Sequence, residues 1–377
     1  MTNILELLKN EKVEWKKLGE VCEFNRGKTI TKKSAIEGEI PVIGGGQKPA
    51  YYHNESNREG VTITVAGSGA YAGFVSYWEQ PIFLSDAFSI EPNQKLNKRY
   101  LFHWLLQNQS RIYELKQGSG VPHVYGSDLA KFEIPIPSIE TQEKIVEILD
   151  KLTNYVTELQ SELQSRTKQY TYYRDKLLSE EYLNKITQNK INNFSLKSVA
   201  EYSSKRISAE ELDIFNYVGV DNLLKDKYGR EDSSYVPETG TSTRFEKGDI
   251  LIGNIRPYLR KIWHADRIGG TNGDVLAVSV KSEDIIDSRY LYHVLADEKF
   301  FDYNIKYSKG AKMPRGDKNK IMEYHFPIPP LHVQQHVVSI LDKFDTLVND
   351  IKEGLPKEIE QRQKQYEYWR SVLLIFK

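Results

Sequence analysis

The chain contains the same sequence twice, and this duplication constrains its fold more than any other feature. Residues 118–151 align without a gap with residues 310–343, at a constant offset of 192 positions. The residues shared between the two copies include, in the numbering of the first, Gly118, Pro122, Pro135, Pro137, Gln142 and Ile148–Lys151. A solenoid repeats every 20–50 residues or so. A unit of about half the chain is therefore a duplicated domain.

The similarity extends in both directions from this segment and is strongest at the ends of each unit. The further matches are residues 99–105 with 289–295 (offset 190), 168–174 with 364–370 (offset 196), Asp86 with Asp274 (offset 188) and Leu18 with Leu196 (offset 178). The middle of each unit matches worst. Shared ends predict a common scaffold, and divergent middles predict a binding function that differs between the copies.

Composition restricts the class of protein. The 377 residues suffice for two or three cores, and 39% are hydrophobic and 28% charged, which is typical of a soluble globular chain. The longest apolar runs fall short of the ~18–20 residues of a membrane span, and no signal peptide is visible at the N-terminus. The single cysteine, Cys22, excludes an internal disulfide and a multi-cysteine zinc site. We therefore expect a cytoplasmic protein without membrane contact.

Two segments have the apolar spacing of long coiled-coil helices. After Pro137 the chain continues to about residue 180 without Gly or Pro, which predicts a rod of roughly 60 Å. Its predicted seam is Ile145, Leu149, Leu152, Val156, Leu159, Leu163, Tyr170, Tyr173 and Leu177. The second seam is Val337, Leu341, Phe344, Val348, Ile351 and Leu355. Such stripes can mediate dimerisation between chains, but a tandem duplication favours an antiparallel pair within one chain.

The second helix carries an interruption that the first lacks. Gly354 and Pro356 lie where the offset between the copies rises from 192 to 196. A four-residue insertion is a stutter in a coiled coil, and proline inside a helix costs about 3 kcal/mol. We therefore predict a kink or a break near residues 354–356.

The remaining sequence predicts an α+β fold. Two mixed, strand-rich domains in pseudo-twofold arrangement, residues 1–138 and 194–330, are separated by two long antiparallel coiled-coil helices, residues 139–180 and 331–377, with a linker at 181–193. Expected strands are residues 61–65, 82–84, 88–90, 250–252 and 275–280, bounded by glycine-rich turns. One helix is expected in each strand-rich domain, at residues 99–107 and 288–298.

Loops of the divergent regions combine basic, amide and aromatic side chains. Arg and Lys can pair with guanine, and Asn or Gln with adenine. A formal net charge of zero argues against DNA binding, but the basic residues gather in these regions, and ordinary surface loops are the alternative. The candidate DNA contacts are Arg26, Lys28, Lys32, Gln47, Lys48, Tyr51, Tyr52, Ser68, Tyr71, His123, Tyr125, Asn254, Arg256, Tyr258, Arg260, Lys261, Lys312 and Arg315.

Sequence motifs for catalysis or metal binding fail on their spacing. Gly27–Thr29 resembles the end of a phosphate-binding loop, but Cys22 replaces the required earlier glycine. His332 and His336 have the spacing of zinc ligands on a helix, but Val333 replaces the metalloprotease glutamate. We therefore predict no catalytic residues and no metal site. A dispersed catalytic triad would not be visible in one sequence.

Three segments together resemble the specificity (S) subunit of type I restriction–modification systems. They are PVIGGGQKPAYYHNESNREGVTITVAGSGAYAGFVSYWEQPIFLSDAF from Pro41, GDILIGNIRPYLRKIWHADRIGGTNGDVLAV from Gly248, and the duplicated IPIPSIETQEKIVEILDK / FPIPPLHVQQHVVSILDK. The likeness covers nearly the whole chain. It implies that the strand-rich domains are target-recognition domains, each reading one half of a bipartite site in double-stranded DNA.

The resemblance also implies a division of labour. The helices would space the two domains and dock two methyltransferase (M) subunits, and restriction (R) subunits would join through the complex. S-adenosylmethionine, ATP and Mg²⁺ would belong to those partners, so this chain would hold no cofactor. The alternatives are a stand-alone DNA-binding regulator with the same two reader domains, and an enzyme in its own right.

Overall fold

The computed structural model describes residues 6, 8, 9, 11–350 and 353–376. Ile351 of the predicted second seam lies outside them. The chain divides into two compact units. Unit 1 comprises residues 1–157 and 361–377, and unit 2 comprises residues 158–360. Each unit therefore combines one strand-rich region with parts of both long helical segments.

Unit 1 is built on an antiparallel four-stranded sheet of order β2-β8-β5-β6. A three-stranded sheet of order β4-β3-β7 and the β1–β9 pair complete its strands. The strands are β1 (Glu14–Lys17), β2 (Cys22–Arg26), β3 (Ile40–Ile43), β4 (Tyr51–His53), β5 (Thr62–Ala66), β6 (Val75–Trp78), β7 (Phe83–Leu84), β8 (Ala87–Pro92) and β9 (Glu133–Ile136). The helices of this region are α2 (Leu18–Val21), α3 (Lys98–Gln107), α4 (Gln109–Glu114) and α5 (Gly126–Leu129).

Unit 2 repeats this plan. Its sheet β11-β18-β15-β16 corresponds to β2-β8-β5-β6, its β10–β19 pair corresponds to β1–β9, and its other sheet has the order β12-β14-β17-β13. The strands are β10 (Asn193–Ser195), β11 (Ala200–Tyr202), β12 (Arg206–Ser208), β13 (Tyr217–Val218), β14 (Thr241–Phe245), β15 (Ile250–Gly253), β16 (Ile262–His264), β17 (Gly269–Thr271), β18 (Val275–Val280) and β19 (His325–Pro327). The helices are α7 (Glu180–Thr187), α8 (Leu196–Val199), η1 (Ala209–Glu211), η2 (Lys225–Lys227), η3 (Pro257–Leu259), α9 (Ser288–Leu295), α10 (Glu298–Lys306) and α11 (Lys318–Met322).

The prediction of one helix in each strand-rich region is wrong. In unit 2 the expected helix 288–298 ends at Leu295, and a second helix, α10, begins at Glu298. Asp297 separates the two because its side chain accepts a hydrogen bond from the backbone N–H of Lys299, which makes it the N-cap of α10. Unit 1 has the same break, with α4 following α3.

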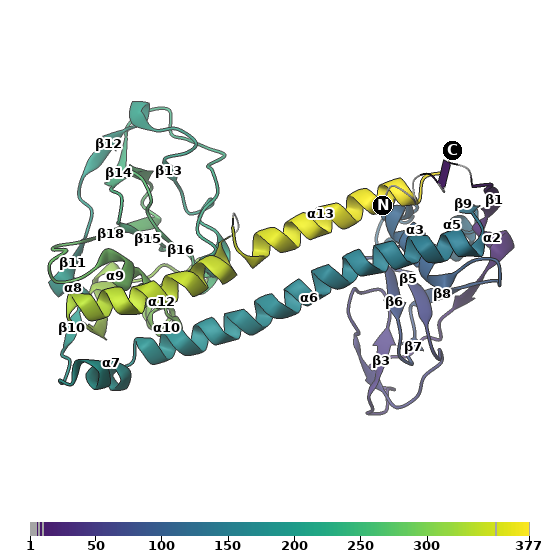
Figure 1. Ribbon diagram of the computed structural model, residues 1–377, viewed down its shortest axis with the longest axis horizontal. Coiled ribbons are helices and arrows are strands. Elements are labelled where there is room, and N and C mark those ends of the chain that lie inside the picture. The colour runs from purple at the N-terminus through teal and green to yellow at the C-terminus, as the bar shows by residue number, and fades with distance from the viewer. Residues whose placement is uncertain (1–5, 7, 10, 351–352, 377) are drawn as a thin grey trace. The chain divides into compact units, whose positions relative to one another are not determined.

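The long helical segments behave as the apolar spacing predicts. Figure 1 shows α6 (Ile139–Leu177) as one uninterrupted helix, and α12 (Leu331–Asn349) and α13 (Leu355–Leu373) as two separate ones. The predicted break is therefore confirmed. Gly354 lies at the break, where an added Cβ would meet the Thr346 carbonyl oxygen at 2.4 Å, and Pro356 lies in the first turn of α13, where proline is tolerated.

The seams pack within the chain. In unit 1 the core includes Ile145, Leu149 and Leu152 of α6 together with Tyr366 and Leu373 of α13. In unit 2 the core joins the C-terminal half of α6 to α12. The beginning of α6 thus packs against the end of the second helical segment, and its end against the beginning, which is antiparallel pairing. Buried seam residues are Ile145, Leu149, Leu152, Val156, Tyr170, Leu177, Val337, Leu341, Val348 and Leu355, and half-buried ones are Leu159, Leu163 and Phe344.

One predicted seam position is wrong. Tyr173 is 41% exposed and its ring stacks on Phe344, whereas Arg174 is 1% exposed. The guanidinium of Arg174 lies over the ring of Tyr170, with its Nε 3.7 Å from a carboxylate oxygen of Asp297. A charged residue can occupy the seam here because an aromatic ring and a carboxylate surround it.

The same polar joint fixes each strand-rich region to its long helix. In unit 1, Asp150 of α6 binds Arg99 Nε at 2.7 Å and His103 Nε2 at 2.8 Å, both on α3. In unit 2, Asp342 of α12 binds the α9 residues Arg289 and His293 at 2.7 Å each. Because these residues belong to the matching parts of the repeat, the joint accounts for the similarity there.

A buried glutamine completes each joint. Gln142 and Gln334 are both fully buried. The side-chain amide of Gln334 donates to the carbonyl oxygens of Ile285 and Pro329, and its oxygen accepts from the N–H of Asp287, the N-cap of α9. Gln142 makes the equivalent three bonds in unit 1. These joints hold the strand-rich regions, and therefore their loops, at fixed positions on the helices.

Candidate nucleic-acid interface

The β5–β6 loop of unit 1 and the β15–β16 loop of unit 2 form the same turn. In unit 1 the N–H of Gly69 donates to Pro122 O (2.9 Å), and the N–H of Ala72 donates to Gly69 O (3.0 Å). In unit 2 the equivalent donors are Arg256, to Pro314 O (2.7 Å), and Leu259, to Arg256 O (2.9 Å). Gly69 and Arg256 are thus equivalent, as are the residues two positions further along each turn.

Each turn carries an exposed tyrosine at its tip. Tyr71 is 46% exposed and Tyr258 is 49% exposed. The segment that follows Gly118 in unit 1, or its equivalent Gly310 in unit 2, packs against the turn of that unit. Val124 N–H donates to Gly67 O in unit 1, and Gly316 N–H donates to Asn254 O in unit 2, both at 3.0 Å. The structure therefore brings together, in each unit, two loops that both contain residues predicted from the sequence as DNA contacts.

In unit 1 these loops border a hollow of about 240 Å³. Arg26, His123 and Tyr125 line it together with Asp86. The rings of His123 and Tyr125 stack at 6.1 Å with an interplanar angle of 15°. Arg26 and Tyr125 are exposed. The hollow thus offers a cation, a carboxylate and an aromatic pair on one surface.

The other predicted contacts of unit 1 lie outside this hollow. Ser68 donates from its hydroxyl to the carboxylate of Asp86, and Tyr51 donates to the carbonyl oxygen of Ile30 at 2.7 Å, so both hydroxyls already have partners. The remaining candidates are exposed loop or strand residues, namely Lys28, Lys32, Gln47, Lys48 and Tyr52. The Gly44–Gly46 turn approaches Ser68 closely, because a Cβ added at Gly45 would meet the Ser68 carbonyl oxygen at 2.4 Å.

In unit 2 several predicted contacts have protein partners. Arg260 Nε lies 2.7 Å from Glu298, Lys261 Nζ donates to Val220 O at 2.6 Å, and Arg315 Nε lies 2.9 Å from Asp274. Burial lowers the pKa of the Lys261 ammonium group. Asn254 is only 4% exposed, so its side chain faces the interior.

Four candidates of unit 2 lie at the surface, namely Arg256, Tyr258, Lys312 and Arg315, and the last of these is paired with Asp274. No hydrogen bond or ion pair to the Arg256 guanidinium is present among the described residues. An exposed guanidinium beside an exposed tyrosine, both on a hydrogen-bonded turn, has the chemistry to pair with a base edge or a phosphate.

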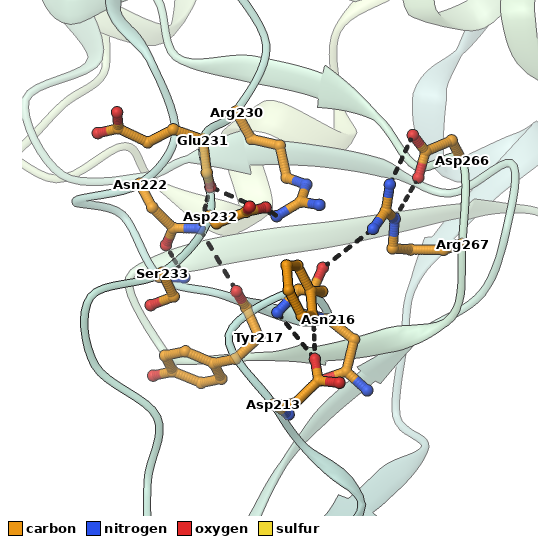
Figure 2. A network of polar contacts seen from close by, with 12 residues as sticks. Asp213, Asn216, Tyr217, Asn222, Arg230, Glu231, Asp232, Ser233, Asp266 and Arg267 are labelled. Atoms are coloured by element: carbon orange, nitrogen blue, oxygen red, sulfur yellow. Dashed lines mark hydrogen bonds and ion pairs between the residues drawn. The ribbon is translucent and has the colours of Figure 1, made fainter.

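The sequence analysis missed a polar network that closes the long β13–β14 connection (Figure 2). The side-chain amide of Asn222 donates to the carbonyl oxygens of Glu231 (3.0 Å) and Tyr217 (3.4 Å), which ties the first part of the connection to β13. Arg230 pairs with Asp232 at 3.3 Å, and its guanidinium lies 5.3 Å from the Trp263 ring centroid. The sequence contained a signal for this insertion, because the offset between the copies rises by ten positions, from 178 to 188.

Two further searches cover the part of the chain that the structure describes. Within it, no group of three or more His, Cys, Asp or Glu side chains is placed to hold a metal ion. In the same residues, none of the helices has the length and apolar character needed to cross a bilayer.

Comparison with known proteins defines the class. A family model for the "Type I restriction modification DNA specificity domain" matches residues 10–169 and again 188–361. The chain therefore belongs to the family of type I restriction–modification specificity subunits. Members of this family are non-catalytic subunits, in agreement with the prediction that the chain is not an enzyme, and membership implies a role in recognising a DNA target.

Individual relatives match over their whole lengths. A protein of Haemophilus influenzae assigned as a type I restriction enzyme specificity subunit is 31% identical, over 100% of this chain and 98% of its own. The EcoR124I/EcoR124II specificity subunit of Escherichia coli is 28% identical, over 100% of this chain and 97% of its own. The crystal structure of an S subunit from M. genitalium has a TM-score of 0.70 at 19% identity, covers 99% of both chains, and shows the same fold.

Proposed function

We propose that the chain sets a bipartite target in double-stranded DNA, with each strand-rich region reading one half. The observation that carries this proposal is the pair of equivalent turns. Their backbone hydrogen bonds are the same in both units and both tips carry a tyrosine, Tyr71 or Tyr258, but the turn has Gly69 in unit 1 where it has Arg256 in unit 2. One framework bearing different side chains suits the reading of two different sequences, because side chains at base edges determine specificity.

The joints and the helices would supply the spacing between the half-sites. Helix α6 has 39 residues, which corresponds to about 58 Å, and it belongs to both units. Asp150 and Asp342 fix each reader to a helix through the same contacts. A stiff helix with a reader fixed to it favours a constant gap between the two half-sites.

The helices also present equivalent surfaces for two identical protein partners. Tyr172 and Tyr368 match in the repeat at offset 196 and are 60% and 61% exposed. Tyr172 contacts Tyr173 edge to face at 5.4 Å, and Tyr368 contacts Trp369 in the same way at 5.5 Å. Exposed aromatic residues are favoured at the centres of protein interfaces. Two methyltransferase subunits are the partners that this duplication suits, with restriction subunits joining through the complex.

The chemistry would then lie in the partners. S-adenosylmethionine would bind the methyltransferase subunits, and ATP and Mg²⁺ would serve methylation-linked restriction in the other subunits. This chain would contribute the choice of sequence and the placement of the enzymes on it.

A domain exchange tests the proposal. Residues 15–137 are replaced by the corresponding region of another specificity subunit, and the methylated sequence is determined for the complex with the methyltransferase. We expect one half of the methylated sequence to change and the other half to stay. An unchanged sequence would refute the assignment of reading to this region. Failure of the purified chain to capture a methyltransferase would instead favour a stand-alone DNA-binding protein.

A further inference from the structure

The two equivalent turns have the same backbone conformation, but different residues occupy the two positions of each turn where φ is positive. In unit 1 the residues with positive φ are Gly69 (+84°) and Gly73 (+85°). In unit 2 they are Arg256 (+52°) and Arg260 (+50°), again four positions apart. Glycine adopts this conformation without steric conflict, whereas a residue with a Cβ does so at a cost. Unit 2 therefore has arginine at two positions where unit 1 has the residue that the backbone prefers.

A facing loop adds to this strain. The described part of the chain has five non-glycine residues with positive φ, and four of them lie in this turn or in the loop opposite. The loop residues are Asp226 (+54°) and Lys227 (+70°). The N–H of Lys227 donates to the carbonyl oxygen of Arg260 at 3.1 Å, which joins the two segments. Strained backbone persists only where its surroundings hold it, and such residues cluster at functional sites.

Glu298 holds both strained segments. One carboxylate oxygen lies 2.8 Å from Lys227 Nζ, and the other lies 2.7 Å from Arg260 Nε. Glu298 is the first residue of α10, and η3, which contains Tyr258, packs against this helix. Burial alone would raise the pKa of Glu298, but Lys227 and Arg260 outweigh it and lower the pKa, which keeps the carboxylate ionised.

The described residues of unit 1 contain no ionic clamp of this kind, and their turn is held by an amide instead. Gln109, the first residue of α4, donates from its side chain to Gly73 O at 2.7 Å and accepts from the N–H of Val75 at 3.1 Å. The residue equivalent to Glu298 at offset 190 is Asn108, whose side-chain amide donates to Trp104 O within its own helix. Gly73, the equivalent of Arg260, has no side chain to bind. A carboxylate is thus present where arginine takes the strained position, and absent where glycine does.

Holding this turn leaves one cation free. Of its two arginines, Arg260 is paired with Glu298, whereas Arg256 is exposed and its guanidinium has no hydrogen-bond or ion-pair partner among the residues that the structure describes. Its backbone N–H is fixed by Pro314 O at 2.7 Å. A planar guanidinium suits bidentate pairing with guanine. The immobilised backbone leaves only the side-chain rotamers of Arg256 to be ordered on binding.

We propose that Glu298 is a positioning residue for DNA recognition by unit 2, which fixes the strained turn through Arg260 and Lys227 so that Arg256 meets its base in one orientation. This proposal rests on the proposed function, since it requires unit 2 to read a half-site. It assigns Arg260, one of the predicted DNA contacts, to the clamp.

The test uses the complex of this chain with its methyltransferase. The half-site read by unit 2 is first identified as the one that changes when residues 194–330 are exchanged. Binding to the full site, and to sites with substitutions in either half, is then measured for the Glu298→Gln, Glu298→Asp, Arg260→Gly and Arg256→Gly variants. Glu283→Gln is the matched control, because Glu283 is an exposed glutamate of the same unit outside the turn.

We expect Arg256→Gly to lose about 5- to 150-fold of discrimination at the unit 2 half-site, the range of one bidentate base contact, without loss of thermal stability, since glycine suits this backbone. Glu298→Gln should lose about tenfold at the same half-site only, and Glu298→Asp should recover part of it. In the Arg260→Gly background, which reproduces the turn of unit 1, Glu298→Gln should have a smaller effect.

Three outcomes would overturn the proposal. The first is that Glu298→Gln keeps full discrimination while the separate Arg256→Gly variant loses it. The second is that Glu298→Gln loses discrimination equally at both half-sites. The third is that Glu298→Gln has an undiminished effect in the Arg260→Gly background. A wild-type complex with no sequence preference would instead refute the proposed function, so the two failures are distinguishable.

Discussion

Replacing Gln334 by methionine should destabilise unit 2 far more than the same change at its neighbour. Methionine has a similar length but makes no hydrogen bonds to the Ile285 and Pro329 carbonyl oxygens or to the Asp287 N–H. The Pro329 contact is buried, and the other two are partly buried. An unsatisfied buried group costs about 1–3 kcal/mol, and each partly buried bond contributes about 0.5–1.5 kcal/mol. Burial of an apolar side chain offsets part of this sum, which leaves about 2–4 kcal/mol.

Calorimetric unfolding of the purified chain measures this difference. For a unit of this size, 1 kcal/mol corresponds to roughly 2–4 °C in Tm, so the transition of unit 2 should fall by about 5–15 °C. Gln335→Met is the control, because Gln335 is exposed on the same turn of α12, and Gln142→Met should have the matching effect on unit 1. The reasoning is refuted if Gln334→Met and Gln335→Met unfold at the same temperature.

Two further predictions concern the joints and the seam. Burial lowers the pKa of His103 and of His293, despite their carboxylate partners. The unfolded chain therefore binds protons at these histidines more readily than the folded chain does. The stability of the fold should be complete above the ordinary histidine pKa of about 6.5 and should fall as the pH drops below it. Urea unfolding at pH 7.5 and 5.5 checks this. Burial also lowers the pKa of His264, to about 4, so a residual slope is expected, but a slope left undiminished when His103 and His293 are replaced by glutamine would contradict the prediction. Leu341→Ala, at a fully buried seam position, should lower the free energy of unfolding by about 2–5 kcal/mol. Leu163→Ala, at a half-buried seam position, should lower it by less. Equal losses for the two variants in denaturant titrations would contradict the packing described for the seam.

Much of the fold could be predicted because the relevant signals are local. The spacing of apolar residues identifies α6, Gly354 and Pro356 identify the break after α12, and the β18 strand begins and ends where its run of apolar residues does. These features depend on periodicity and backbone chemistry, which a single sequence contains.

The errors occur where distant residues decide the outcome. Arg174 takes a seam position in place of Tyr173 because Asp297, far along the chain, offers it a carboxylate. The predicted contacts Arg260 and Lys261 bind protein groups, Glu298 and the Val220 carbonyl oxygen. A cation in a loop looks the same in the sequence whether it is free or paired, so the candidate site could be located from composition but not resolved into free and structural residues.

The central claim is that one chain reads two different half-sites through two copies of the same framework. Methylome sequencing of a host that expresses this chain with its methyltransferase tests it most directly. The account predicts a single methylated sequence made of two unrelated half-sites separated by a fixed gap of unspecified bases. A continuous motif, two identical half-sites or a gap of variable length would contradict it.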